Sequence, residues 1–389
     1  MVGGGYGGAT AAKYLRLLSG YAIDVTLVEP QAAFVSCPLS NLVVGGSRTM
    51  ADITRPYTAL AARHGVTIVR DTATSIDTAA RRVRTEASGT LPYDKLVVSP
   101  GVDFRFSEVE GLEAANASGA VLHAWKAGAQ TLALRRQLEA IPDGGVFAIG
   151  IPEVPYRCPP APYERACQAA WYFKQAKPRS KVLVLDANPD VASKPALFRA
   201  LWSGPFAGLV EYRPQHTLTA VDAGTRTLSF EVQDDVKADV LNVIPPQRAG
   251  RIATTAGLAN QASNRWVGVD FRTFESTVAR DVFVIGDAIQ IAPGMPKSGH
   301  MANSHAKVAA AAIVAQLAGR LPEAHPLLHS TCYSFVDDRR AMHISSVHRY
   351  DEGTYHSLPA SAESSTAATE AEWPLALAWA SGIWADMLA

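Results

Sequence analysis

Two cysteines, Cys158 and Cys332, and one nearby acid have the types and settings for sulfur redox chemistry. Cys158 stands in a proline-rich turn shortly before a predicted helix that runs from Tyr163 to Lys174. A thiol near a helix N-terminus has a lowered pKa and is a better nucleophile or leaving group. Glu164, in the first turn of that helix, is placed to take or deliver a proton. Cys332 is far away in sequence, but separate domains can bring two such residues together.

The residues alone leave several interpretations of these thiols open. Cys158 and Cys332 form either a redox pair or a structural disulfide, or Cys332 is a buried structural thiol. Cys167 falls on an apolar helix face with Ala170 and Trp171, which predicts a packed core thiol. No C-x-x-C-H motif is present, so any haem must belong to a partner.

The N-terminus carries a motif that is typical of dinucleotide-binding folds. Three residues make a G-x-G-x-x-G run before a helical stretch: Gly3, Gly5 and Gly8. These glycines allow a tight turn, close approach of a pyrophosphate and close packing of helix on strand, and the helix N-terminus favours the phosphates. Glu29 ends the next predicted strand, where a ribose hydroxyl needs an acceptor. Only Met1 and Val2 precede the glycines, so we expect the chain to begin inside its first strand.

A second flavin signal lies far downstream. An apolar run ends in Gly286 and Asp287, and an Asp at the carboxyl end of a strand can accept hydrogen bonds from a ribityl chain. A helix is predicted to follow, with proline and serine near its first turn. Lys297 and the amides of Ser298 and Gly299 are candidates to stabilise the negative charge of a reduced flavin near N1 and O2. Together with the glycine motif, these residues predict bound FAD.

Length and composition fit a multidomain enzyme. The chain has 389 residues, of which 48% are hydrophobic, enough for ordinary cores. Acidic and basic residues balance at 36 each, without a basic tract, which argues against nucleic acid as a partner. No apolar stretch reaches the roughly 20 residues of a spanning helix, so no transmembrane segment is expected. No metal site is predicted.

The order of predicted elements gives an α/β fold with two Rossmann-like domains and a smaller C-terminal interface domain. The FAD domain is discontinuous, and residues 351–372, rich in Ser, Ala, Thr and Glu, are predicted to form a surface excursion. The predicted boundaries are 1–110 and 243–320 for the FAD domain, 111–242 for the second dinucleotide-type domain and 321–389 for the interface domain.

The second Rossmann-like unit lacks a phosphate cradle. Its first predicted strand ends at Gly150 and continues as Ile-Pro-Glu-Val-Pro, where a nucleotide site needs glycines. Bulky residues and proline fill the pyrophosphate seat, and Glu153 repels a diphosphate. NAD(P)H is therefore not expected to bind there, and electrons must come from another donor.

The chain resembles the flavin subunit of flavocytochrome c sulfide dehydrogenase, within the sulfide:quinone reductase branch of the two-dinucleotide flavoproteins. The resemblance covers nearly the whole length. It is carried by six segments, GGGYGGATAAKY from residue 3, CPLSN from residue 37, HAWKAG from residue 123, RCPPAPYERA from residue 157, IPPQRAG from residue 244 and MPKSG from residue 295.

This resemblance implies specific roles. Cys37 would hold FAD through an 8α-thioether, Cys158 and Cys332 would form a disulfide over the flavin, and Glu164 would transfer protons beside it. Sulfide would attack one sulfur of the disulfide and give a persulfide and a free thiolate that donates to the flavin. The reduced flavin would pass electrons singly to a c-type cytochrome subunit. Trp379 would match the family's tryptophan beside the flavin, although Trp373 and Trp384, or a packing role for all three, stay open.

Two other functions remain as alternatives. A sulfide:quinone oxidoreductase at the membrane surface would share this frame, and the apolar tail from residue 373 to 384 suits an amphipathic surface. A non-catalytic electron-transfer or sulfur-binding subunit would use the disulfide structurally. The resemblance implies a periplasmic location, while any export signal would lie outside this chain. His300 and His305 are given no chemistry and are expected to be ordinary polar surface residues.

Overall fold

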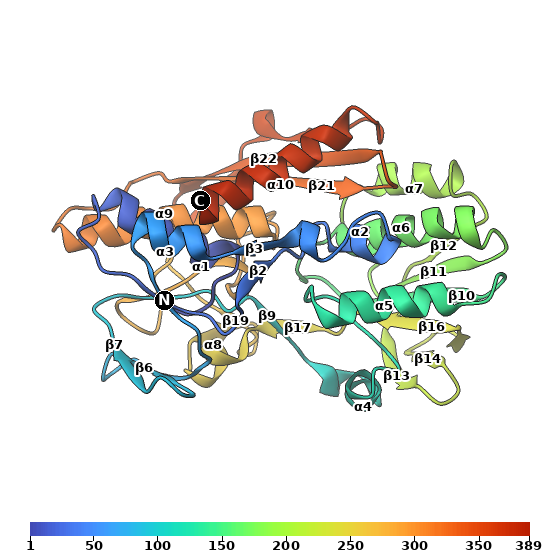
Figure 1. The fold of residues 1–389 in the computed structure, drawn as a ribbon, viewed down its shortest axis with the longest axis horizontal. Coiled ribbons are helices and arrows are strands. Elements are labelled where there is room, and N and C mark those ends of the chain that lie inside the picture. Colours follow the sequence, from blue (N-terminus) through green and yellow to red (C-terminus); the bar gives the residue numbers. More distant parts are fainter.

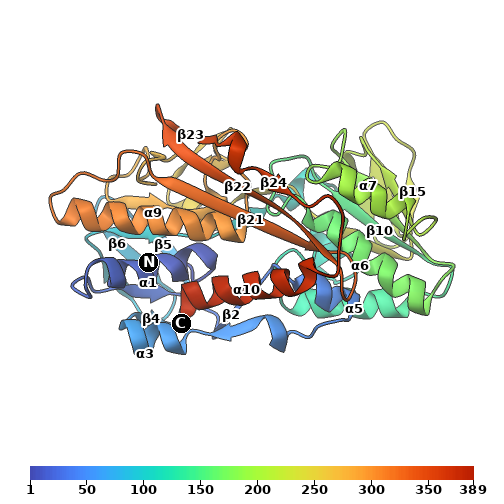
Figure 2. The same cartoon turned by 90° about the horizontal axis from the view of Figure 1, so that it is seen from above.

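The fold is described for all residues, 1–389, by a computed structural model. Two α/β halves lie side by side along the longest axis, and a C-terminal sheet and helix run across both of them (Figures 1 and 2). The predicted α/β class with two Rossmann-like domains is confirmed. The predicted domain boundaries stay a prediction.

The first half is built on a parallel sheet. Val2 lies at its centre, because it bridges to Val28 on one side and to Val98 on the other. Its four strands are β1 (Thr26–Val28), β4 (Thr67–Val69), β8 (Leu96–Val98) and β20 (Val282–Val284). Two helices, α1 (Tyr6–Leu18) and α9 (Gly299–Leu317), pack against each other beside it.

The second half contains a four-stranded parallel sheet in the order β12, β11, β10, β16. Its strands are β10 (Val146–Ile151), β11 (Lys181–Asp186), β12 (Val210–Arg213) and β16 (Val240–Val243). An antiparallel sheet packs nearby, consisting of β13 (Leu218–Asp222), β14 (Thr227–Phe230) and β15 (Val236–Lys237). The larger helices here are α5 (Ala129–Ala140), α6 (Ala161–Ala176) and α7 (Pro195–Ser203). Helix α6 begins two residues earlier than predicted.

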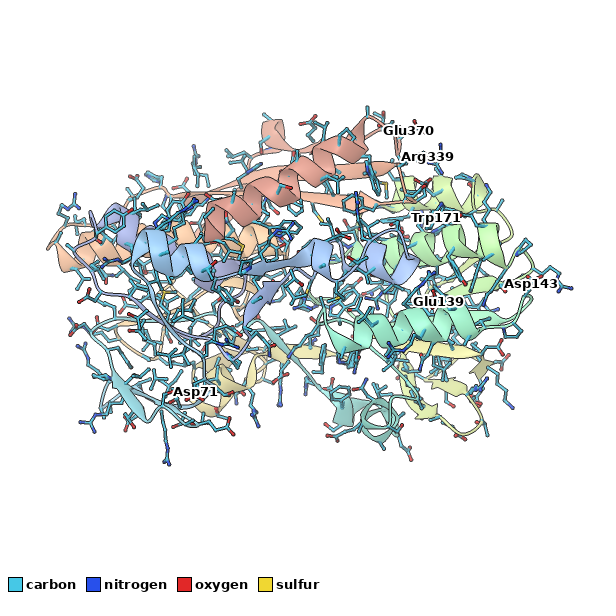
Figure 3. All side chains as sticks on the ribbon, viewed as in Figure 1. Asp71, Glu139, Asp143, Trp171, Arg339 and Glu370 are labelled. Atoms are coloured by element: carbon cyan, nitrogen blue, oxygen red, sulfur yellow. The ribbon has the colours of Figure 1, made fainter.

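The C-terminal part is an antiparallel sheet with one helix. Its elements are β21 (Leu327–Phe335), β22 (Ala341–Asp351), β23 (Thr354–Ser357), β24 (Glu363–Ser364) and α10 (Glu372–Leu388). Residues 351–372 are mostly exposed, as predicted, and include two short strands. Arg339 and Glu370 lie beside each other where this part approaches the second half, 3.8 Å apart (Figure 3).

Shorter elements complete the fold. The helices are α2 (Ser40–Gly45), α3 (Thr58–His64), α4 (Leu112–Ala117) and α8 (Arg251–Thr255). The strands are β2 (Ala33–Val35), β3 (Thr54–Pro56), β5 (Ala73–Asp77), β6 (Arg82–Thr85), β7 (Thr90–Pro92), β9 (Val102–Phe104), β17 (Gln247–Ala249), β18 (Ala259–Gln261) and β19 (Trp266–Val267). None of the helices combines the length and the apolar character that crossing a bilayer requires.

The buried apolar side chains form separate cores that leave a seam between the halves. The largest core joins the first parallel sheet, α1 and α9 to residues of α10, including Ile383 and Trp384. The second core surrounds β10, β11 and α6. The loops that leave the two parallel sheets face this seam, and the carboxyl ends of parallel strands are where α/β folds bind ligands.

Candidate active site

A single cavity of about 600 Å³ runs along the seam from the glycine loop to Cys158. Both halves contribute to its lining. The predicted site residues that line it are Gly3, Gly5, Glu29, Cys37, Cys158, Gly286, Asp287 and Gly299. The structure therefore brings together motifs from both flavin signals and from the turn around Cys158, which are distant in sequence.

The glycine loop at one end of the cavity has no room for a side chain at Gly3 or Gly8. A Cβ on Gly8 would lie 1.7 Å from the Gly3 carbonyl oxygen, and Gly3 itself has φ +92°. A Cβ on Gly5 would meet nothing within 4 Å, because this residue faces the open cavity. The loop thus combines close packing of helix on strand with an open seat for phosphates, as a pyrophosphate cradle requires.

Replacing Gly8 with alanine is expected to abolish flavin binding at this site. The added Cβ must push the Gly3 carbonyl away, which should cost about 2–3 kcal/mol of folding free energy and displace the phosphate seat. The matched control is Gly382→Ala in α10, where a Cβ meets nothing within 4 Å. Flavin absorbance per protein and chemical unfolding should show loss in the first variant only. Full flavin content in Gly8→Ala would contradict the cradle assignment.

Two acids lie where FAD needs acceptors. Glu29 follows β1, and its carboxylate accepts hydrogen bonds from the backbone N–H of Gly4 at 2.7 Å and of Gln31 at 2.8 Å. Asp287 is buried, lines the cavity, and its Oδ1 has no hydrogen-bond partner within the protein. Burial raises the pKa of Asp287. An orphaned acceptor is costly unless a ligand hydroxyl satisfies it, so this residue fits a ribityl chain.

The cation predicted to face the flavin is placed differently. Lys297 is buried with its Nζ 2.8 Å from the Asp287 carbonyl and 2.6 Å from the Ile289 carbonyl, and it lies over the Trp266 ring. It does not line the cavity. Burial lowers its pKa to about 7, so the ammonium is only partly charged near neutrality. Its role toward a reduced flavin stays a prediction, and the structure places the ammonium behind the cavity lining.

The start of α9 matches the prediction better. Ser298 is the N-cap, and its Oγ accepts a hydrogen bond from Met301 N at 3.1 Å. Its side chain is committed to the cap, while Gly299 faces the cavity. The first turn of α9 therefore presents its N-terminus toward the bound ligand through backbone groups.

Cys158 and Cys332 meet at the other end of the cavity. Cys158 lies on the turn between β10 and α6, where its N–H donates to the Lys297 carbonyl at 2.7 Å, and Cys332 lies on β21. The two side chains lie close enough for each thiol to shift the pKa of the other. All four cysteines are free thiols in this structure. The expected pairing in space is therefore present, without a covalent bond.

The order of the two thiol pKa values is the reverse of the prediction from sequence. The neighbouring Cys158 thiol lowers the pKa of Cys332, and the positive charge of Lys194 acts in the same direction against the opposing effect of burial. The same contact, burial and the neighbouring Glu164 raise the pKa of Cys158. Proximity to the N-terminus of α6 is outweighed, so Cys332 is the more acidic thiol.

Glu164 is buried beside the pair and is held by two donors. Its Oε1 accepts from Asn41 Nδ2 at 3.0 Å, and its Oε2 accepts from the Phe335 N–H at 3.2 Å. Burial raises the pKa of Glu164 to about 7, against the opposing effect of these hydrogen bonds. A carboxyl group that titrates near neutrality beside two thiols is suited to move protons.

A buried arginine next to Glu164 went unnoticed in the sequence. Arg165 lines the cavity and donates to Asn41 Oδ1, Asn242 Oδ1 and the His123 and Ala124 carbonyls, at 2.8–3.0 Å. All four acceptors are uncharged, so its positive charge acts on the cavity. The signal available in the sequence was its position directly after Glu164 in the segment that carries the resemblance.

The aromatic and histidine residues near the C-terminus stand outside the cavity lining. Trp379 Nε1 donates to His300 Nδ1 at 3.3 Å, and the ring packs against Tyr333, next to Cys332. Trp384 contacts the cavity indirectly, because its Nε1 donates to the Tyr6 hydroxyl at 3.2 Å. His305, expected at the surface, is fully buried and accepts from the Gly286 N–H at 3.2 Å.

The fourth cysteine has a purely structural setting. Cys167 is fully buried in the core around α6, which confirms the predicted packed thiol. Burial raises its pKa well above the ordinary value, so it is an unreactive thiol.

Comparisons with known proteins identify the family of this chain. A family profile described as "Sulfide dehydrogenase (flavocytochrome c) flavoprotein chain, central" matches residues 131–245, and "Flavocytochrome c sulphide dehydrogenase, flavin-binding" matches residues 324–388. A stretch of 43 residues is 65% identical to the flavoprotein chain of sulfide dehydrogenase (flavocytochrome c) from Chlorobaculum thiosulfatiphilum, covering 11% of this chain and 88% of that sequence. The chain belongs to the flavocytochrome c sulfide dehydrogenase flavoprotein family. The resemblance found in the sequence is thereby confirmed.

Other matches extend the family to its neighbours. "Pyridine nucleotide-disulphide oxidoreductase" describes residues 1–139. The mitochondrial sulfide:quinone oxidoreductase of Dictyostelium discoideum is 26% identical over 297 residues, 74% of this chain and 64% of that enzyme, so the chain spans slightly less than two thirds of its length. The Aquifex aeolicus sulfide-quinone reductase is 25% identical over 355 residues, 85% of this chain and 79% of that enzyme.

Solved structures show the same architecture. The sulfide:quinone oxidoreductase of Aquifex aeolicus superposes with a TM-score of 0.81 at 19% identity, covering 99% of this chain and 90% of that chain. At this identity the likeness concerns the fold alone. The flavocytochrome c sulfide dehydrogenase family member described here is thus a flavoprotein oxidoreductase with an FAD cavity between two Rossmann-like domains.

Proposed function

We propose that this flavoprotein oxidises sulfide to sulfane sulfur or polysulfide through the Cys158 and Cys332 pair and FAD, and passes the electrons to a c-type cytochrome subunit. The observation that carries the proposal is the contact of the two thiols at the end of the FAD cavity. Cys158 lines the cavity while Cys332 does not. This difference supports Cys158 as the sulfur that reacts with the flavin and Cys332 as the sulfur that holds substrate sulfur.

The chemistry begins with the cysteine pair oxidised to a disulfide. Hydrosulfide attacks one sulfur, so a persulfide forms there and the other cysteine leaves as a thiolate. Glu164, with a pKa of about 7, accepts the proton of the incoming sulfur. FAD held by the glycine loop, Glu29 and Asp287 would supply a two-electron acceptor for the sulfur pair and a one-electron donor for the cytochrome. Arg165 supplies positive charge that favours anionic groups in the cavity.

We further propose that FAD is held covalently by Cys37. This thiol follows β2 and lines the cavity, and Tyr6 and Ser36 beside it hydrogen-bond each other at 2.7 Å. A thioether at this position would prevent loss of the cofactor and change its electronics. The proposal is supported by the match of the surrounding sequence to the family.

Replacing Cys37 with serine tests the thioether directly. Acid precipitation of the wild-type protein should leave the flavin in the pellet, while Cys37→Ser should release it into the supernatant. The variant should still bind FAD when native, because the glycine loop, Glu29 and Asp287 are unchanged. Cys167→Ser is the matched control and should retain its flavin in the pellet. Release of flavin from the wild-type protein would remove the thioether from the proposal.

A cytochrome partner is favoured over quinone by the two flavocytochrome family profiles, which together span much of the second half and the C-terminal part. A periplasmic location would follow from such a partner. The competing function is sulfide:quinone oxidation, which the relatives from Dictyostelium and Aquifex carry in their names. Both functions use the same sulfur chemistry and differ in the electron acceptor.

Anaerobic mixing with sulfide tests the proposal. Sulfide should bleach the flavin absorbance, and reoxidation should then be followed with a c-type cytochrome, a soluble quinone and NAD⁺ in parallel. Reoxidation selective for cytochrome supports the proposed function, and selectivity for quinone supports the alternative. Absence of bleaching in protein with bound flavin and an oxidised cysteine pair would contradict sulfide oxidation altogether.

A further inference from the structure

Lys194 occupies an unusual position beside the cysteine pair. It stands at the end of the loop between β11 and α7, as the N-cap of α7 and directly before Pro195. Its φ is +56°, a left-handed conformation that costs energy for a lysine and is disfavoured before proline. The residue is also buried, with only 6% of its surface exposed. A buried, strained lysine requires a compensating role.

The ammonium of Lys194 points to the strand that carries Cys332. Its Nζ donates to the Cys332 carbonyl at 3.0 Å and to Ser334 Oγ at 2.9 Å. Both acceptors are uncharged, so the positive charge is not neutralised by the bonds that hold it. Burial weakens screening by water, and the charge therefore acts on nearby anionic groups.

The loop that delivers Lys194 takes the place where a second nucleotide would be bound. Asp186, at the end of β11, has the position of a ribose-binding acid, but its carboxylate accepts from Tyr163 at 2.6 Å, Tyr212 at 3.1 Å and Asn188 Nδ2 at 2.7 Å. The Tyr163 hydroxyl also accepts from the Ala192 N–H at 3.0 Å. These bonds close the acid off and fix the loop against α6.

We propose that Lys194 is a positioning residue that holds the anionic sulfur of the reaction on Cys332 and leaves Cys158 as the sulfur that reacts with the flavin. The inference rests on the proposed role of the cysteine pair. It assigns a function to the degenerate second dinucleotide domain, whose loop supplies a charge to the sulfur site in place of binding a nucleotide.

The step that Lys194 serves is the opening of the disulfide. Hydrosulfide adds to the sulfur of Cys332, the bond between Cys158 and Cys332 breaks, and its electron pair leaves on Cys158. The persulfide on Cys332 gives its proton to Glu164 and becomes an anion beside the ammonium. Sulfide sulfur is oxidised by two electrons, and the disulfide is reduced by two.

Other charged and titratable groups around Cys332 do not replace this cation. Glu164 on α6 is an acid and adds negative charge when ionised. Arg157, before α6, is nearer to Cys158, whose pKa it lowers. His300 on α9 accepts from the Thr331 N–H and is neutral, because burial lowers its pKa to about 4. Lys194 is the cation that acts on Cys332, whose pKa it lowers.

Alkylation of the reduced protein tests the inference without sulfide or turnover. The holoprotein is reduced with dithiothreitol, treated with iodoacetamide over about pH 5 to 9 and analysed by peptide mass mapping. In the wild type, Cys332 should react with iodoacetamide before Cys158. The pH at which labelling of Cys332 is half-maximal, its midpoint, should lie well below the pKa of about 8.5 of an ordinary thiol. In Lys194→Met the Cys332 midpoint should rise by about one pH unit or more, which slows labelling about tenfold at low pH.

Two further variants give the controls. Lys194→Arg keeps the charge and should keep the low midpoint. Lys177→Met removes another lysine that donates to backbone carbonyls, among them Leu138 O at 3.4 Å, and should leave the midpoint unchanged. An unchanged midpoint in Lys194→Met, or a wild-type Cys332 that reacts like an ordinary thiol or after Cys158, would overturn the inference. Where Lys194→Met does not fold, Lys194→Gln is measured in its place, with the same expected rise of the Cys332 midpoint.

Different results contradict the proposed function and the inference about Lys194. A flavin that sulfide does not bleach, in a protein whose Cys332 midpoint still depends on Lys194, contradicts the proposed function and leaves the charge assignment standing. Bleaching by sulfide with no dependence of the midpoint on Lys194 contradicts only the further inference.

Discussion

Replacing Cys332 with serine is expected to abolish the bleaching of the flavin by sulfide, with a loss of about a thousandfold or more in the rate. Without this sulfur no disulfide forms with Cys158, and hydrosulfide has no bond to break. Flavin binding should persist, because Cys332 does not line the FAD cavity. Anaerobic stopped-flow absorbance measures the rate, and the flavin spectrum measures occupancy.

Cys167→Ser is the matched control for this result. It removes a thiol from the adjacent helix α6, where Cys167 is buried in the core, so it should lower stability and leave the bleaching rate unchanged. A structural disulfide makes the opposite prediction for Cys332→Ser, namely lost stability with sulfide-dependent bleaching intact in the surviving protein. Thermal unfolding measured beside the kinetics separates the catalytic from the non-catalytic alternative.

Replacing Glu164 with glutamine is expected to slow sulfide oxidation about a hundredfold. The pKa of Glu164 is about 7 because the group is buried, so the base is protonated at low pH and becomes available as pH rises through neutrality. The wild-type rate should therefore rise steeply across this range, and the variant should keep only the weaker dependence that comes from the ionisation of hydrogen sulfide. The pH profile of the bleaching rate is the measurement, since a purely structural effect would lower the rate without changing its shape.

The same shift has a consequence for stability with a defined sign. The pKa of Glu164 is raised from 4.5 to about 7, so between these values the folded protein keeps a proton that the unfolded chain has released. Glu164 therefore makes unfolding easier as pH rises through this range.

A wild-type bleaching rate that is flat across neutrality while Glu164→Gln is slow would show that Glu164 acts only by holding Asn41 and the Phe335 N–H.

Motifs whose chemistry is local were readable in the sequence. The glycine run needs no distant partner to define a phosphate cradle, and Asp287 is recognisable by its place after an apolar strand. The pairing of Cys158 with Cys332 came from the resemblance, because nothing in either segment specifies that β21 packs against α6. That contact depends on tertiary bonds such as Gln168 Nε2 to the Phe335 carbonyl, at 3.0 Å.

Local sequence does not determine where a side chain points. Lys297 stays a candidate to stabilise a reduced flavin, and the structure places its ammonium on two backbone carbonyls and over the Trp266 ring. The lowered pKa expected for Cys158 from its helix is outweighed by the neighbouring Cys332 thiol and by burial. The direction of a side chain and the coupling between two thiols depend on tertiary contacts, and local sequence motifs do not reveal these contacts.

The packing of α10 on α1 ties the phosphate cradle to a helix that lies outside the cofactor cavity. Asn303 on α9 donates to Thr10 of α1 at 2.9 Å and to Asp386 of α10 at 2.8 Å, so one amide joins three helices that are distant in sequence. Helix α1 carries the phosphate cradle at its start. A change that loosens α10 therefore reaches the glycine loop through this amide, without touching any residue of the cavity.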